Sequence, residues 1–162
     1  MKLSLLTSKI LAYRELPNFN MDDSIDWAIE MLELGYDTPS LLMLAGISKP
    51  TNFLETEYYL LHSLKELDIQ IPNREDAILG YCKYYIEKIS VNENVRANLT
   101  NVHNLAQSAL EEPNINSDFY LLAWAWGDFD YEQTYTDYWP EATPETIESI
   151  VISKAKEWLI IN

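Results

Sequence analysis

The chain has 162 residues, 48% of them hydrophobic, and its 26 acidic and 11 basic residues give a formal net charge of -15. A chain of this length suits one domain, and its apolar content excludes an intrinsically disordered protein. The negative charge argues against nucleic acid and anionic membranes as partners, because both would repel the chain, and it favours a basic protein.

The first residues and the single cysteine indicate a cytosolic protein. The apolar run from Leu3 to Leu6 is too short for the core of a signal peptide or for a membrane span. Cys82 is the only cysteine, which excludes an internal disulfide and a Cys-x-x-Cys motif and fits a reducing compartment. We therefore expect a cytoplasmic protein that does not enter a membrane.

Capping residues divide the first half of the chain into four predicted helices. Thr38 followed by Pro39 is a helix start with proline at the first helical position, and Asn52 with Glu55 has the form of a capping box. The predicted helices run from Thr7 or Ser8 to Arg14 ahead of Pro17, from Asp22 to a Gly35 cap, from Ser40 to Ala45 ahead of Gly46, and from Asn52 to Leu67.

Apolar spacing and further caps predict four helices in the second half. The helix from Asn73 to Ser90 has an apolar face made of Ile78, Tyr81, Cys82, Tyr85, Ile86 and Ile89. The next predicted elements are a helix from Asn94 to Leu110 ended by Pro113, a helix capped by Ser117 that carries Phe119 to Trp126, a long loop from Gly127 to Ala142, and a last helix from Thr143 and Pro144 to Trp158.

About eight helices with short connections predict an all-α fold. The arrangement is either a compact antiparallel multi-helix bundle or a short stack of helix pairs. A regular solenoid is less favoured, because no repeat with a fixed period is present. We expect residues 1–162 to form a single acidic helical domain.

One stretch of the chain resembles a known group of proteins. The run WAIEMLELGYDTPSLLMLAG at Trp27–Gly46, followed by Glu55 to Leu67, is similar to a segment of small, uncharacterised bacterial helical proteins. Some of those proteins resemble immunity proteins encoded beside secreted toxins. The resemblance covers roughly residues 20–70 and rests on helix caps and core spacing. It implies a helical fold and an inhibitory role, and it carries over no functional residue.

Residues with catalytic or metal-binding chemistry lack the neighbours that such sites need. No Glu-x-x-His or His-x-x-x-His spacing surrounds His62, and His103 lies among asparagines, where a hydrogen-bonding surface histidine is the simpler interpretation. Cys82, on an apolar face, is interpreted as a small buried hydrophobe. The chain has no glycine-rich phosphate loop and no Gly-x-Ser-x-Gly motif. The sequence thus predicts a protein that is not an enzyme, with no cofactor and no metal.

The acidic residues form two blocks, of which the first lies between Arg14 and Lys49. This stretch has seven acidic residues and no basic one. Spacings of four, four and three positions place four of them on one helix face: Asp22, Asp26, Glu30 and Glu33. The face is either an ordinary solvated surface or a second candidate for partner binding.

The second block, from Ala97 to Ser153, has ten acidic residues and no lysine or arginine. Tyr120 and Trp124, four residues apart, are predicted to lie in the core. Later aromatic residues alternate with carboxylates, and tyrosine and tryptophan are common anchors of protein interfaces. The alternative is a packed aromatic loop that holds the last helix, and the two roles are compatible. The predicted partner-binding residues are Asp128, Phe129, Asp130, Tyr131, Glu132, Tyr135, Asp137, Tyr138 and Trp139.

These observations lead to one functional hypothesis and two alternatives. The chain is expected to be an acidic binding protein that neutralises a basic partner, most concretely an immunity protein that inhibits a toxin such as a nuclease. A nucleic-acid mimic would need carboxylates spaced like phosphates over a long face with few aromatic residues at its centre, and the aromatic block disfavours it. A structural or adaptor domain would show scattered surface charge and no aromatic patch.

Overall fold

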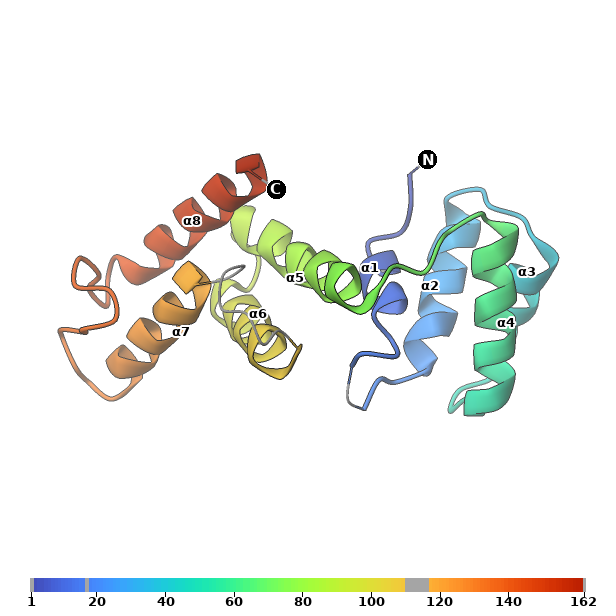
Figure 1. Ribbon diagram of the computed structural model, residues 1–162, viewed down its shortest axis with the longest axis horizontal. Coiled ribbons are helices and arrows are strands. Elements are labelled where there is room, and N and C mark those ends of the chain that lie inside the picture. The colour runs from blue at the N-terminus through green and yellow to red at the C-terminus, as the bar shows by residue number, and fades with distance from the viewer. Residues whose placement is uncertain (1, 17, 110–116, 162) are drawn as a thin grey trace. The chain divides into compact units, whose positions relative to one another are not determined.

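The computed structural model describes residues 2–16, 18–109 and 117–161, and within these ranges the chain forms eight helices and no strand (Figure 1). The predicted all-α fold with about eight helices is confirmed. The helices are α1 (Thr7–Leu11), α2 (Asp22–Glu33), α3 (Pro39–Ala45), α4 (Phe53–Glu66), α5 (Arg74–Ser90), α6 (Val95–Ala109), α7 (Ser117–Asp130) and α8 (Ile147–Ile161).

The chain is grouped into two compact units, Met1–Gly80 and Tyr81–Asn162, and the division falls inside α5. Each unit contains its own cluster of buried apolar side chains. The expectation of a single domain over residues 1–162 stays a prediction, because the compactness of two parts does not test whether they fold separately.

The first unit is built around α3, which packs against both α2 and α4, while α1 packs against α2. Trp27 of α2 is fully buried, and its indole N–H donates to the hydroxyl of Thr7 in α1 at 3.0 Å. This buried hydrogen bond satisfies the one polar atom of a large apolar ring. The core is completed by further fully or almost fully buried side chains, namely Met31, Leu41, Leu44, Leu60 and Leu64.

The predicted cap at Gly35 and the Asn52 half of the predicted capping box are present, whereas the predicted Thr38 side-chain cap is not formed. The side-chain oxygen of Asn52 accepts the Glu55 backbone N–H at 3.2 Å, as in a capping box. Gly35 has a φ of +93°, in the left-handed region that favours glycine at a helix end. Pro39 is the first residue of α3, although the Thr38 side chain makes no capping hydrogen bond.

Helix α1 is shorter than predicted, because it ends at Leu11 rather than at Arg14. The chain continues in turns, and the Tyr13 hydroxyl reaches the Glu57 carboxylate at 2.6 Å. Burial, together with this hydrogen bond, raises the pKa of Tyr13 to about 12. The predicted stop signals Pro17 and Pro113, and the predicted helix end at Leu110, lie outside the described residues.

Helix α5 has the cap and the apolar face that the sequence predicts. The side-chain oxygen of Asn73 accepts the Asp76 backbone N–H at 2.9 Å, and the helix begins at the next residue, Arg74. Of the six residues of the predicted face, Tyr85 is half-buried and the other five are buried, namely Ile78, Tyr81, Cys82, Ile86 and Ile89. The predicted burial of Cys82 is thereby confirmed, and the slow reaction of its thiol stays a prediction.

The second unit is built from α6, α7 and α8, each of which packs against the other two. Its core is one buried cluster that contains Phe119 and Leu122 of α7, Leu99 and Val102 of α6, and Val151 of α8. The last turns of α5 add Ile86 and Ile89 to this cluster.

The predicted start of the long loop at Gly127 is wrong, since α7 continues to Asp130. Glycine inside a helix costs roughly 1 kcal/mol relative to alanine. Phe129, however, packs against the core of the second unit. This tertiary contact outweighs the low helix propensity of one glycine, as packing commonly does.

The predicted start of the last helix is also displaced, because α8 begins at Ile147 and not directly after Thr143. Thr143 and Thr146 form a turn ahead of the helix. The Thr146 hydroxyl accepts the Thr143 backbone N–H at 2.9 Å, and the Thr146 backbone N–H donates to the Thr143 carbonyl at 3.0 Å. These local bonds offer the backbone an alternative to the first helical turn.

Candidate functional site

The acidic aromatic segment, defined here as residues 128–139, follows the core helix α7 and divides into two groups of side chains. Three of the nine predicted partner-binding residues are half-buried: Asp128, Phe129 and Trp139. Six are exposed to solvent: Asp130, Tyr131, Glu132, Tyr135, Asp137 and Tyr138. The segment is therefore partly packed against the second unit and partly free to contact a partner.

The buried side chain of Thr136 links two parts of the segment through hydrogen bonds. This residue is 1% exposed, and its hydroxyl donates to the Asp128 carboxylate at 2.7 Å while accepting the Tyr138 backbone N–H at 3.2 Å. Asp128 thus acts as an acceptor for a buried hydroxyl. The chain reverses at Glu132, which has a φ of 62°, a conformation that non-glycine residues adopt uncommonly.

Phe129 and Trp139 anchor the two ends of the segment to the core. Both pack against the buried cluster of the second unit. The Lys154 ammonium lies 5.9 Å from the centroid of the Trp139 ring, within the range of a cation–π contact. The predicted interface role of these two rings remains untested, but their contacts give them a structural role.

Tyr131 and Tyr135 are the rings that the segment presents most openly. Tyr131 is 82% exposed and Tyr135 is 57% exposed. A hydrogen bond with Asp137 raises the pKa of the Tyr135 phenol above its ordinary value. Tyr135 and Asp137 together present a ring, a hydroxyl and a carboxylate to solvent.

The basic residues that border the acidic block neutralise only part of it. Arg96 of α6 pairs with Asp130 at 2.6 Å, and its guanidinium lies 5.3 Å from the centroid of the Trp126 ring. Glu132, Glu141 and Glu148 are exposed and make no ion pair with any described residue. These carboxylates give the surface around the segment its negative potential.

A second group of rings continues the aromatic surface onto α6 and α7. Tyr138 stacks on Trp124, with centroids 5.8 Å apart, and His103 stacks on Tyr120 at 5.1 Å. His103 also meets Trp124 edge to face at 5.9 Å. We call Tyr138, Trp124, Tyr120 and His103 the aromatic row. It joins the acidic aromatic segment to two helices.

The prediction that Tyr120 and Trp124 lie in the core is wrong, because they are 40% and 42% exposed. Phe119 and Leu122 occupy the core face of α7 instead. His103 also differs from the surface histidine that the sequence indicated, since its Nδ1 is buried and has no hydrogen-bond partner among the described residues. The i, i+4 spacing of Tyr120 and Trp124 was the available signal for a shared surface face, whereas nothing in the sequence placed His103 beside them.

A shallow hollow of about 280 Å³ adjoins the acidic aromatic segment. It is lined by Leu121, Tyr138, Trp139, Pro140 and Glu141. The hollow therefore combines apolar walls with one exposed carboxylate. Sequence reasoning did not identify it, because its walls come from α7 and from a connection whose path was not predicted.

The second predicted face, on α2, is largely occupied by contacts within its own unit. Asp22 accepts the Thr51 backbone N–H at 2.9 Å, and Asp26 pairs with Lys49 at 2.5 Å. Glu30 accepts the hydroxyl of Ser4. Only Glu33 of the four is exposed. These carboxylates hold neighbouring segments to α2, and partner binding at this face stays a prediction.

The described residues include no group of three or more His, Cys, Asp or Glu side chains that could hold a metal ion. His62 lies on the surface of α4, where its Nδ1 is 2.8 Å from the Tyr58 carbonyl oxygen and its ring packs against the Tyr58 ring. No described helix combines the length and the apolar composition that crossing a membrane requires.

Comparison of the chain with protein-family models, with curated proteins and with solved structures gives no match.

Proposed function

We propose that the chain is an acidic binding protein that neutralises a basic protein partner, most concretely a bacterial immunity protein that inhibits a toxin, such as a nuclease, in the cytosol of the producing cell. The observation that carries this proposal is the exposure of Tyr131, Tyr135 and Tyr138 beside Glu132 and Asp137 on a segment anchored by buried Thr136. Exposed rings on an anchored support, surrounded by charge of one sign, are typical of protein-binding surfaces.

Charge and rings act at different steps of this proposed binding. A net charge of -15 attracts a basic protein over a distance of several ångströms, and this attraction raises the rate of association. The tyrosine rings bury apolar area only after contact, so they mainly lower the rate of dissociation. Because Thr136, Phe129 and Trp139 hold the segment, little conformational entropy needs to be lost on binding.

The first test separates steering from anchoring. The full chain is used to capture a basic protein encoded in its genetic neighbourhood, and the association and dissociation rates of the complex are measured at several salt concentrations. The double substitution Glu132→Gln with Asp137→Asn should slow association several-fold and flatten its salt dependence, with little change in dissociation. The double substitution Glu75→Gln with Glu87→Gln, which removes two exposed carboxylates of α5, is the charge-matched control.

The second test concerns the rings. Tyr131→Ala and Tyr135→Ala should each speed dissociation, by about 30-fold for a ring that contributes roughly 2 kcal/mol. Ile160→Ala, which truncates an equally exposed apolar side chain on α8, should leave both rates unchanged. Unchanged rates in all segment variants, each with an intact fold by circular dichroism, would show that the segment is a packing element only.

A further inference from the structure

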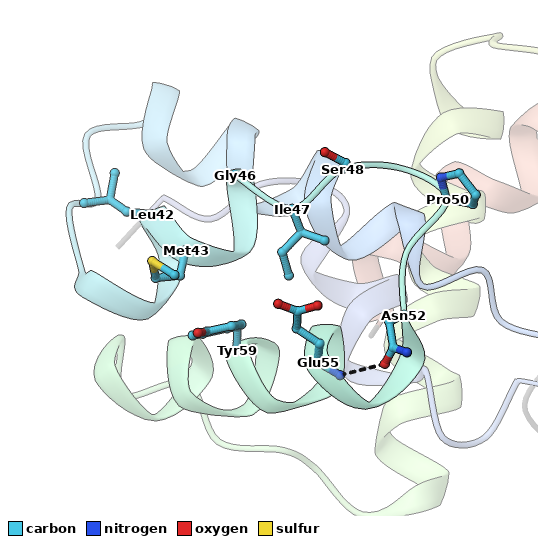
Figure 2. Close-up of a pocket in the computed structure, with 9 residues that line it drawn as sticks. All are labelled: Leu42, Met43, Gly46, Ile47, Ser48, Pro50, Asn52, Glu55 and Tyr59. Carbon is cyan, nitrogen blue, oxygen red and sulfur yellow. Dashed lines mark hydrogen bonds between the residues drawn. The ribbon is translucent and has the colours of Figure 1, made fainter.

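A hollow on the first unit has a different construction from the acidic aromatic segment. It measures about 560 Å³ and lies between the end of α3, the connection at residues 46–52 and the first turns of α4 (Figure 2). Met43, Ile47 and Tyr59 provide apolar walls, and Glu55 is the only acidic residue that lines it. None of the described lining residues is basic.

The carboxylate of Glu55 is turned into this hollow. Figure 2 shows it directed away from its own helix toward Ile47. The Glu55 backbone N–H donates to the Asn52 side chain, but its carboxylate makes no hydrogen bond or ion pair with any described residue. Only half of the capping box is therefore formed, and the charged end of the side chain is left available.

The rim of the hollow is held in place by the acidic residues of α2. Asp22 accepts the Thr51 backbone N–H at 2.9 Å, and Asp26 pairs with Lys49 at 2.5 Å. The one basic residue in the 46–52 connection is thus directed to α2 and neutralised there. The carboxylate of Glu55 is therefore left as the negative group of the hollow, and two contacts with α2 hold the connection that forms its rim.

Large apolar side chains are exposed around the same two packed helices. Met43 is 54% exposed and Leu54 is 76% exposed, and Leu42 and Tyr58 are each more than half exposed. Leu42 and Met43 also line the hollow, and exposed apolar side chains at the mouth of a hollow suit contact with a protein better than with a small ion. The occupant should therefore be a side chain presented by a protein.

We propose that this hollow receives a lysine or arginine side chain of a basic protein. The aliphatic part of that side chain would lie against Met43, Ile47 and Tyr59, and its cationic end would meet the Glu55 carboxylate. Lysine and arginine suit such a site because a long apolar stem carries the charge. The inference rests on the proposed function for the existence of the basic partner, but its site lies in the other unit from the acidic aromatic segment.

The test uses small probes on the full chain. Nα-acetyl-lysine amide and Nα-acetyl-arginine amide are titrated into the ¹⁵N-labelled protein, and Nα-acetyl-norleucine amide serves as the uncharged analogue that keeps the four-carbon stem of lysine but lacks its ammonium group. The amide resonances of Ile47, Ser48 and Glu55 should shift saturably with the two basic probes, with Kd on the order of 1 to 10 mM for fragments of this size. Norleucine should bind at least about tenfold more weakly if one charge-assisted contact is lost.

Substitution of one carboxylate then tests whether the preference for the basic probes depends on Glu55. Glu55→Gln keeps the side-chain shape and the backbone cap, and it should remove the preference for lysine over norleucine. Glu148→Gln removes the same charge elsewhere and should leave that preference intact. Equal binding of lysine and norleucine by the wild type, no saturable shift at all, or unchanged lysine binding in Glu55→Gln would each overturn the inference.

These outcomes are distinguishable from a failure of the proposed function. If Glu55→Gln keeps its lysine binding while the Tyr131 and Tyr135 variants release a captured partner faster, the hollow is not a cation site and the proposed function stands. If the probe depends on Glu55 but no basic protein binds the chain, the hollow site stands and the proposed function fails.

Discussion

His103 combines an exposed aromatic contact with a buried polar atom. Its ring stacks on Tyr120 and meets Trp124 edge to face, while its Nδ1 is buried without a hydrogen-bond partner among the described residues. Burial lowers the pKa of His103 below its ordinary value of 6.5. The folded state therefore favours the neutral imidazole more than the unfolded chain does.

We predict that protonation of His103 destabilises the second unit in mild acid. Because its folded pKa lies below the unfolded value of 6.5, the contribution to stability is complete above pH 6.5 and is lost as the pH falls through the folded pKa. The loss is at most about 1.4 kcal/mol per pH unit for one proton. His103→Phe keeps a ring but cannot be protonated, so urea unfolding of this variant should depend less on pH between about pH 7 and 5.

Parallel profiles for the wild type and His103→Phe across this range would contradict the prediction. Measurement of the imidazole C–H chemical shift of His103 against pH gives a second readout. That titration should have its midpoint below 6.5.

The chemistry of individual site residues could be predicted from the sequence, but their exposure could not. The alternation of rings and carboxylates in 128–139 was compatible with an interface and with a packed loop, and the structure exposes six of the nine predicted residues and half-buries three. Helical spacing shows that Tyr120 and Trp124 share a face, yet it does not show which face meets the core. Most positions in α7 are apolar, so more than one face of this helix could pack against the core. Tertiary packing decides that Phe119 and Leu122, and not Tyr120 and Trp124, are buried.

At the scale of elements, the helices with explicit caps were the most predictable. Asn52, Gly35 and Asn73 each make a local interaction that depends on few neighbours, and each lies within two residues of the helix terminus that it marks. Errors occurred at Gly127 and at Thr143, where a distant core contact or a competing turn decides the boundary. The hollow between α3 and α4 could not be predicted from the sequence either, because its lining residues come from separate segments that are brought together only by folding.

We predict that Asn73→Ala destabilises the protein by about 1 kcal/mol, the usual cost of losing an N-cap side chain. Asn73 accepts the Asp76 N–H at 2.9 Å, and its amide donates to the Asp76 carboxylate at 2.8 Å. The control is Asn104→Ala, which changes an exposed asparagine inside α6. It should be neutral or slightly stabilising, because alanine has the higher helix propensity. Equal stability of the two variants in chemical denaturation would refute the capping role.

A further prediction separates the packed part of the acidic aromatic segment from its exposed part. Trp139→Ala should lower the free energy of unfolding by about 2 kcal/mol, because a half-buried ring leaves the core cluster. Tyr131→Ala should change stability by less than about 0.5 kcal/mol, as surface substitutions usually do. Thermal and urea unfolding of both variants test this. A Trp139→Ala protein as stable as the wild type would return that residue to the interface candidates.

At the scale of the whole molecule, negative charge is spread over both units. Met1–Gly80 has 13 acidic and 6 basic residues, and Tyr81–Asn162 has 13 acidic and 5 basic residues. Among the residues that the structure describes, ion pairs such as Arg96 with Asp130 involve only a minority of the carboxylates. Each unit therefore carries a net self-repulsion that its core must overcome.

We predict that salt stabilises the protein. Raising the NaCl concentration from about 10 mM to about 150 mM shortens the screening length from roughly 30 Å to roughly 8 Å and weakens the repulsion among carboxylates. The melting temperature should rise by several degrees, although the exposed ion pairs lose some attraction at the same time. NaCl and KCl should act equally if screening is the cause. A melting temperature that falls with salt would show that the ion pairs dominate.

The buried hydroxyl of Thr136 has a consequence for how this surface could diversify. Thr136, Phe129 and Trp139 fix the path of the chain from beneath, while Tyr131, Glu132 and Tyr135 take no part in that framework. Side chains at Tyr131 and Tyr135 can therefore be exchanged without redirecting the backbone, whereas the positive φ of Glu132 restricts that position to residues that tolerate it, such as glycine and asparagine. Relatives that recognise a different target should keep the three inner residues and differ at the outer ones, so that new specificity arises on an unchanged support.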